Sequence, residues 1–252
     1  MSKIIAVANQ KGGVGKTTTC VNLCAALTEQ NLRVLLCDMD PQGNATSGLG
    51  IDKNKADPNI YNVLIDGIEA SDVIIKTAYG DVMPSNRILS GASVELVTTQ
   101  GREYVLKTVL DSIRHEYDFI LIDCPPSLEM LTLNSLCAAD TVLIPVQCEY
   151  FALEGLSDLM TTIRMIKKAL NPKIDIEGVL LTMYDARTNF SSQVAAEIKR
   201  FFSNKVYTVS IPRNVRVAEA PSHGMPVTGY DKPSRGSIAY IELAKEVIKR
   251  NA

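Results

Sequence analysis

Short apolar runs recur along this chain, and they are nearly continuous instead of alternating between apolar and polar residues. This pattern is typical of strands that are buried on both faces of a sheet. Segments with helical periodicity, such as 20–27 and 156–170, lie between the runs. The alternation predicts an α/β fold with a single doubly wound, mostly parallel sheet flanked by helices. The predicted strands are 4–8, 34–37, 119–122, 142–146, 179–183 and 206–211.

Two further regions add smaller elements to this prediction. Residues 50–100 contain short amphipathic pieces separated by Pro and Gly, which predict small helices and one or two short edge strands. Residues 234–248 predict an amphipathic helix whose polar face mixes acidic and basic residues. Docking onto the sheet is therefore favoured over insertion into a membrane. The apolar face of this helix would carry Ile238, Ile241, Ala244, Val247 and Ile248.

Length and composition fit one soluble domain. The chain has 252 residues, of which 46% are hydrophobic, and neither a linker nor a repeat divides it, so residues 1–252 are predicted to form a single domain. The sequence shows neither a secretory signal nor an apolar run of membrane-spanning length, which predicts a cytoplasmic protein. Its six cysteines lie in apolar segments without a C-x-x-C pair, so buried thiols are expected instead of disulfides.

The net charge of −2 hides an asymmetry. Residues 186–216 contain six cations and one anion, a local charge of +5 that leaves −7 for the rest of the chain. A basic patch on an acidic body is suited to binding a polyanion. Solvated charges on helices and loops are the alternative interpretation. The six cations are Arg187, Lys199, Arg200, Lys205, Arg213 and Arg216.

Residues 9–18, Asn-Gln-Lys-Gly-Gly-Val-Gly-Lys-Thr-Thr, follow the first predicted strand and open a helix. Glycines in such a loop let backbone amides surround phosphate oxygens, and the helix N-terminus adds partial positive charge. Lys16 would reach the β- and γ-phosphates, and the Thr17 hydroxyl would hold Mg²⁺. The segment therefore predicts a nucleotide-binding protein. The expected binding residues are Lys11, Gly12, Gly13, Val14, Gly15, Lys16, Thr17 and Thr18.

Carboxylates follow two other predicted strands. Asp38 and Asp40 emerge after the second strand, beside the phosphate-binding loop, where one of them could orient a water molecule. Asp123 ends the strand at 119–122, and this arrangement is typical of a residue that reaches Mg²⁺ directly or through water. A surface turn at 38–41 and a helix-capping role for Asp123 are the simpler alternatives.

The loop departs from the pattern G-x-x-x-x-G-K-[ST], because Gln10 replaces the first glycine and Lys11 is an additional lysine. In these features it resembles the deviant phosphate loop K-G-G-x-G-K-[ST] of the ParA/MinD class of ATPases. Further segments extend the resemblance over nearly the whole chain, and together they resemble Soj/ParA-type chromosome- or plasmid-partitioning ATPases. These segments are DPQGNATSGLG, IDCPPSL, PVQCEY with ALEGL, LLTMYDART and IPRNVR with EAPSHG.

The resemblance implies a mechanism. ATP with Mg²⁺ would close a homodimer in which Lys11 reaches the partner's nucleotide, much as an arginine finger acts in trans. In this class, Asp40 positions the attacking water, Asp38 supports the metal shell, and residues 147–156 face the partner. Lys11, Lys16 and Asp40 would thus be catalytic, and Thr17, Asp38 and Asp123 would hold the metal.

Two binding surfaces complete the expectation. Met183 and Pro212 would sandwich the adenine while Asn214 offers an amide to its edge, although a core Met and a turn Pro-Asn would look the same in isolation. The dimer would bind DNA without sequence preference, and a ParB-type centromere-binding partner would stimulate hydrolysis and release. Such a protein would be associated with the nucleoid. The expected DNA contacts are Arg187, Lys199, Arg200, Arg216 and Arg235.

Two other functions within this class are less favoured. A MinD-like, membrane-associated regulator of the division site would need a basic amphipathic extension beyond the last predicted helix, and the sequence ends at Asn251-Ala252. A metabolic or kinase member would need an acceptor pocket or a terminal tyrosine cluster, and neither is evident.

Overall fold

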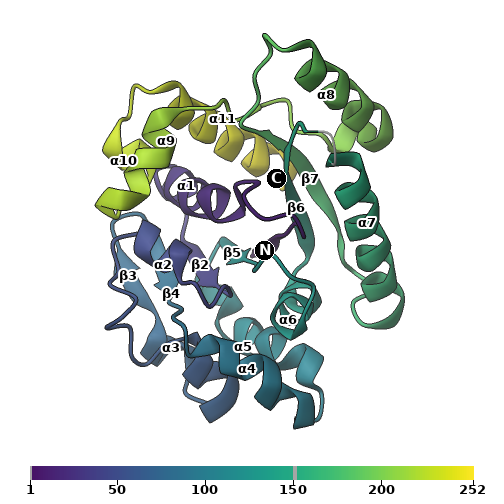
Figure 1. Cartoon of the computed structure of the whole chain (residues 1–252). Coiled ribbons are helices and arrows are strands. Elements are labelled where there is room, and N and C mark those ends of the chain that lie inside the picture. The colour runs from purple at the N-terminus through teal and green to yellow at the C-terminus, as the bar shows by residue number, and fades with distance from the viewer. Residues whose placement is uncertain (1, 150–151) are drawn as a thin grey trace.

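The computed structural model describes residues 2–149 and 152–252. Within these residues, seven strands form one sheet in the order β3-β4-β2-β5-β1-β6-β7 (Figure 1). Neighbouring strands are parallel, except that β3 runs antiparallel to β4 at one edge. The predicted doubly wound sheet is therefore confirmed. The strands are β1 (Lys3–Val7), β2 (Val34–Asp38), β3 (Ile75–Thr77), β4 (Gly80–Met83), β5 (Phe119–Asp123), β6 (Thr141–Gln147) and β7 (Asp175–Thr182).

Both faces of the sheet are covered, as the continuous apolar runs require. Successive residues of β1 enter different cores: Ile4 and Ala6 pack with α5, α6 and α7, whereas Ile5 and Val7 pack with α1 and α11. Figure 1 shows these two groups of helices on either side of the strands. The helices are α1 (Lys16–Thr28), α5 (Val105–Ile113), α6 (Met130–Ala138), α7 (Ala152–Ala169), α8 (Asn189–Phe202) and α11 (Arg235–Arg250).

Short elements fill the remaining connections, and the small helices and edge strands expected within residues 50–100 are confirmed. Strands β3 and β4 lie there, together with a π-helical turn at Asn62–Asp66. All six cysteines, each in the described part of the chain, are buried free thiols. The short helices are α2 (Asn44–Gly48), α3 (Ala70–Val73), α4 (Leu89–Glu95), α9 (Val215–Glu219) and α10 (Val227–Tyr230).

The predicted strand at 206–211 is wrong. The segment touches β7 at two points, where Tyr207 donates to the Val179 carbonyl (2.9 Å) and Ile211 to the Leu181 carbonyl (2.8 Å). Between them, the amides of Thr208 and Val209 donate to the carboxylate of Glu246 on α11 instead. The helix thus supplies acceptors that a neighbouring strand would have supplied, and the segment bows away from β7.

The expected C-terminal helix exists as α11, but its buried face is rotated from the predicted one. Tyr240, Leu243, Ala244 and Val247 are buried against the core that contains α1, whereas Ile238 is 51% exposed. The docking prediction is therefore confirmed, although Ile238 was assigned to the wrong face. Among the described residues, none of the helices is both long enough and apolar enough to span a membrane.

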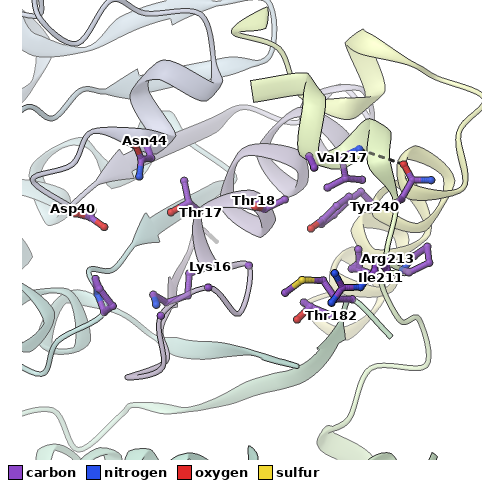
Figure 2. Close-up of a pocket in the computed structure, with 18 of the residues that line it drawn as sticks. Lys16, Thr17, Thr18, Asp40, Asn44, Thr182, Ile211, Arg213, Val217 and Tyr240 are labelled. Carbon is purple, nitrogen blue, oxygen red and sulfur yellow. Dashed lines mark hydrogen bonds between the residues drawn. The ribbon is translucent and has the colours of Figure 1, made fainter. Parts of the chain in front are cut away.

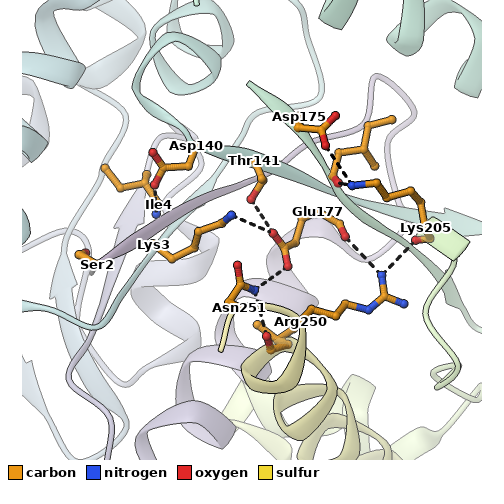
Figure 3. Close-up of polar contacts among 12 residues, drawn as sticks. Ser2, Lys3, Ile4, Asp140, Thr141, Asp175, Glu177, Lys205, Arg250 and Asn251 are labelled. Carbon is orange, nitrogen blue, oxygen red and sulfur yellow. Dashed lines mark hydrogen bonds and ion pairs between the residues drawn. The ribbon is translucent and has the colours of Figure 1, made fainter. Parts of the chain in front are cut away.

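Polar contacts fix the end of α11 to the end of the sheet where the parallel strands β1, β6 and β7 begin (Figure 3). The buried carboxylate of Glu177 on β7 accepts from Thr141 (2.7 Å) and Asn251 (2.7 Å), and Lys3 lies 3.5 Å away. Arg250 donates to the Val206 carbonyl at 2.9 Å and lies over the Tyr207 ring. The last helix is therefore anchored by apolar contacts, hydrogen bonds and a cation–π contact.

Replacement of Leu243 by Ala tests this docking. The fully buried side chain leaves a cavity in the core, so Leu243→Ala should lower the free energy of unfolding by about 2–5 kcal/mol, as measured by chemical denaturation. Ile238→Ala on the same helix is the matched control and should change it by less than about 0.5 kcal/mol. Equal effects would contradict the observed helix face.

Candidate active site

The loop at 9–18 connects β1 to α1. At two positions its backbone has a conformation that only glycine, which lacks Cβ, adopts easily. Gly13 and Gly15 have left-handed φ angles of 73° and 89°. Gly15 immediately precedes α1, so the free amides of the first helical turn face the loop. This arrangement is suited to binding an anion. Val14 is buried, so only its backbone is placed to serve a ligand.

Two side chains that were not predicted to belong to the site anchor this loop. Asn9 donates to the Pro145 carbonyl (2.8 Å), and its side-chain oxygen accepts from the Lys11 amide (3.0 Å). Thr182 at the end of β7 donates to the Val14 carbonyl (2.7 Å). The contacts of Asn9 with Pro145 and of Thr182 with Val14 join segments distant in sequence, so they tie the loop to β6 and to the end of β7.

A cavity of about 510 Å³ opens beside the loop (Figure 2). Its volume lies within the ordinary range for small-ligand sites. In Figure 2, Lys16 and Thr17 lie toward one side and Tyr240, Arg213 and Ile211 toward the other. The cavity therefore has a phosphate-loop end and a more apolar end. The residues that were predicted from the sequence to belong to the site and that line this cavity are Gly12, Gly13, Gly15, Lys16, Thr17, Thr18, Asp40, Met183, Pro212 and Asn214.

The apolar end brings together two segments, as predicted. Tyr184 donates to the Ile211 carbonyl (3.0 Å), which holds Met183 and Pro212 on adjoining stretches of chain. Met183 has a left-handed φ of 48°, an uncommon conformation for this residue type. Asn214 caps α9 by accepting from the Val217 amide (3.3 Å), so its side-chain NH₂ group remains the part suited to a ligand.

Lys16 is only 7% exposed, and its ammonium donates to the Lys11 carbonyl (3.1 Å). Burial lowers the pKa of Lys16, and the nearby charges of Asp123 and Asp40 oppose this effect. The ammonium is thus held at the phosphate end of the cavity, close to the carboxylates.

Asp123 is fully buried, and among the described residues neither carboxylate oxygen has a partner in good hydrogen-bond geometry, although the Thr17 hydroxyl and the Cys20 thiol lie near enough to lower its pKa. Burial raises its pKa well above the usual range, and the neighbouring charge of Asp38 raises it further. Buried ionised groups are normally paired or bound to a metal. Asp123 and the hydroxyl of Thr17 therefore fit the protein's share of a Mg²⁺ site, since Mg²⁺ commonly takes its other ligands from phosphates and water.

A metal site that takes most of its ligands from phosphates and water needs few protein side chains. Accordingly, the described residues hold no group of three or more His, Cys, Asp or Glu side chains that could bind a metal by themselves.

Asp38 differs from Asp123. One of its oxygens accepts from the amide (2.8 Å) and hydroxyl (2.7 Å) of Thr46, and the other accepts from the Asp40 amide (3.2 Å). Burial raises the pKa of Asp38 to about 6. These contacts favour a role in supporting the loop over direct metal binding.

Asp40 lines the cavity and is 8% exposed. Its carboxylate accepts from the Gln42 amide (2.9 Å), and its carbonyl accepts from the hydroxyl of Ser85 (2.8 Å). The Ser85 amide in turn donates to the hydroxyl of Thr46 (2.9 Å). Thr46 and Ser85 were missed in the sequence. Ser85 follows β4 closely, and this position at a strand end was the available signal.

The additional lysine of the loop does not point into the cavity. Its ammonium lies 2.6 Å from the carboxylate of Glu149, which follows β6. Lys11 is not one of the described residues that line the cavity. Residues 150 and 151 of the expected partner-facing segment 147–156 lie outside the described residues.

Comparison with known proteins agrees with this geometry. Residues 2–176 match a protein family described as an AAA domain. The chain is 57% identical to the sporulation initiation inhibitor protein Soj of Bacillus subtilis, over 98% of both chains. It is 49% identical to the chromosome partitioning protein ParA of Myxococcus xanthus, over 100% of this chain and 89% of that one. The chain belongs to the Soj/ParA family of chromosome-partitioning ATPases.

A solved structure supports the fold of this Soj/ParA family member independently. Cobyrinic acid a,c-diamide synthase of Mycobacterium smegmatis, with bound ADP and magnesium, superposes with a TM-score of 0.87 at 39% identity. The match covers 99% of this chain and 95% of that one. The sequence identity to the partitioning proteins is higher, so the family assignment rests on them.

The basic residues predicted to contact DNA are all exposed, but several are ion-paired. Arg187 lies 2.7 Å from Asp185, and Arg216 lies 2.9 Å from Glu219 and 3.1 Å from Asp231. Lys199 and Arg200 lie on α8, and Arg235 begins α11. The predicted DNA surface thus draws on the loop before α8, on α8 itself, on α9 and on α11.

Asp123→Asn tests the bare carboxylate. Without nucleotide at pH 8, the variant should unfold with a free energy about 1–2 kcal/mol higher than the wild type, because a neutral amide is less costly to bury than an unpaired charge. A raised folded-state pKa makes the native carboxylate more destabilising as pH rises, so the gain should shrink at pH 5. The variant should also lose Mg²⁺-dependent nucleotide binding in calorimetry. Lower stability at pH 8 would show that Asp123 has a partner.

Proposed function

We propose that this chain uses Mg·ATP to form a homodimer that binds DNA without sequence preference, and that hydrolysis releases the dimer from DNA. The observation that carries the proposal is the buried carboxylate of Asp123, which has no partner in good hydrogen-bond geometry among the described residues and whose charge acts on Lys16, a residue that lines a cavity of about 510 Å³. Such a site is suited to a polyphosphate and a cation together.

The phosphate end would bind and orient the triphosphate. The amides of Gly12–Thr18 would surround its oxygens while Lys16 exchanges the Lys11 carbonyl for a phosphate oxygen. When bound to Thr17 and Asp123, Mg²⁺ would neutralise charge on the phosphates. At the other end, Met183 and Pro212 would pack against the base, and the NH₂ group of Asn214 would donate to its edge.

Asp40 would hold the attacking water. Its placement rests on Ser85 and Thr46, which fix the backbone of the 38–40 loop. Positioning and charge stabilisation account for most of the rate in phosphoryl transfer, so a weakly basic carboxylate suffices. Asp38 would support this loop and thereby the metal shell, and Lys11 would act on the partner's nucleotide.

A cycle of DNA binding follows from these parts. The dimer would join two exposed basic surfaces and thereby strengthen a weak, salt-dependent attraction to phosphates. A centromere-binding partner of the ParB type would stimulate hydrolysis, and the protein would therefore be located on the nucleoid in the cytoplasm. The family assignment and the exposed Arg187 and Arg216 support this part of the proposal.

Asp40→Ala tests the catalytic role. The variant should bind Mg·ATP and dimerise like the wild type, because the phosphate-binding loop is intact, but its hydrolysis rate should fall about 100-fold or more. Phosphate release and light scattering measure the two properties. Asp72→Ala removes an exposed carboxylate elsewhere and should leave both unchanged. Wild-type turnover by Asp40→Ala would assign the water to another residue.

The double variant Arg187→Ala/Arg216→Ala tests the DNA surface. Its affinity should fall about tenfold for every sequence, with a shallower salt dependence, because fewer counterions are released. ATP binding should persist, since exposed ion pairs contribute little stability. Arg33→Ala removes an arginine paired with Asp118 at 3.0 Å and is the matched control. DNA binding equal to that of the control would place the surface elsewhere, and ATP-dependent pelleting with anionic vesicles instead of DNA would favour a membrane regulator.

A further inference from the structure

The ion pair between Lys11 and Glu149 joins the phosphate-binding loop to the segment after β6. The ammonium and carboxylate lie 2.6 Å apart, and the two side chains are 35% and 46% exposed. The backbone of Lys11 is anchored separately, since its amide donates to Asn9 and its carbonyl accepts from Lys16. The loop is therefore held in its binding shape while this one side chain is directed to a carboxylate outside the cavity lining.

The strength of this pair lies in a useful range. The short distance is that of a charge-assisted hydrogen bond. Because both groups are partly solvated, such a pair is typically worth a factor of only about two in an equilibrium. A triphosphate carries several negative charges, so it would compete successfully with a single carboxylate for the ammonium. The contact defines a resting direction for Lys11 without fixing it permanently.

We propose that Glu149 is a positioning residue that holds Lys11 away from nucleotide in the free monomer and releases it when a second copy presents its bound triphosphate. This inference rests on the proposed ATP-dependent dimer. The carboxylate occupies the ammonium in place of a phosphate, so each subunit must exchange one anion for another as the dimer closes. Glu149 therefore opposes dimerisation and keeps the basal hydrolysis rate low at low protein concentration.

A different role for Glu149 gives the opposite sign. If the carboxylate contacts Lys11 or the partner within the closed dimer, its removal weakens the dimer. If the ion pair has no role in the exchange, its removal changes nothing. The direction of the effect on dimerisation therefore separates these three possibilities.

The first experiment examines the nucleotide-free monomer. Amine acetylation of the full chain is followed by mass spectrometry of the peptide that contains Lys11, in the wild type and in Glu149→Gln. We expect acetylation at Lys11 to become at least about twofold faster in the variant, while Lys107 on α5 reacts at an unchanged rate. Equal rates at Lys11 would overturn the proposal, whether or not the protein forms a dimer.

The second experiment measures dimerisation with Mg²⁺ and the non-hydrolysable analogue AMPPNP by light scattering. Glu149→Gln should lower the dimer dissociation constant about fourfold, because two pairs, each worth about a factor of two, no longer have to be broken. Asp111→Asn is the matched control, since it breaks an ion pair with Lys107 of similar length (2.7 Å) and exposure (42% and 44%). The control should leave the constant unchanged.

The outcomes distinguish this inference from the function on which it rests. If the wild type dimerises and Glu149→Gln dimerises equally or less tightly, Glu149 does not hold Lys11 in reserve. If neither protein dimerises with the analogue, the proposed ATP-dependent dimer is wrong, and the release step is overturned with it. In that case the acetylation rates still show whether Glu149 protects Lys11 in the monomer.

Discussion

The register of three parallel strands buries a carboxylate whose oxygens have no partner in good hydrogen-bond geometry among the described residues. Asp123 ends β5, opposite Val7 of β1 and Asp38 of β2, so it is enclosed on both sides by the sheet. Burial of this unpaired charge does not stabilise the fold, because desolvation disfavours the ionised carboxylate. The two apolar cores offset this cost, and we propose that a cation bound at Asp123 would remove it. Ligand binding and folding would then be linked through one side chain.

Asp38 shows how the same environment produces a different role. It lies beside Asp123 and is equally buried, but Thr46 and the Asp40 amide satisfy its oxygens. From Thr46, hydrogen bonds continue through Ser85 to the carbonyl of Asp40. The segment that follows β4, the neighbour of the edge strand β3, thereby helps to fix the backbone of Asp40, the residue that we propose to position the water. A region that reads as irregular in the sequence thus fixes the geometry of the site.

The features that follow from local chemistry could be predicted, and those that depend on a distant partner could not. The phosphate-binding loop and five of the six apolar strands carry their pattern within a few neighbouring residues. The segment 206–211 has the same apolar pattern. However, the carboxylate of Glu246, on a helix distant in sequence, accepts hydrogen bonds from two of its amides. The direction of Lys11 depends on Glu149, 138 residues away in the chain. The exposure of Ile238 depends on how α11 is rotated against the core, which helical periodicity leaves open to within a residue or two.

The bowed segment at 206–211 has an architectural meaning. It leads directly into Pro212 and Asn214, and its course is set by a carboxylate on the last helix, whose own end is fixed by Arg250 and Asn251. One wall of the cavity is thus built on the C-terminal helix, while the opposite wall is built on the first strand and helix. Residues near both ends of the polypeptide therefore line one cavity. A nucleotide bound as we propose would need both ends, because the amino-terminal half alone lacks the wall proposed for the base.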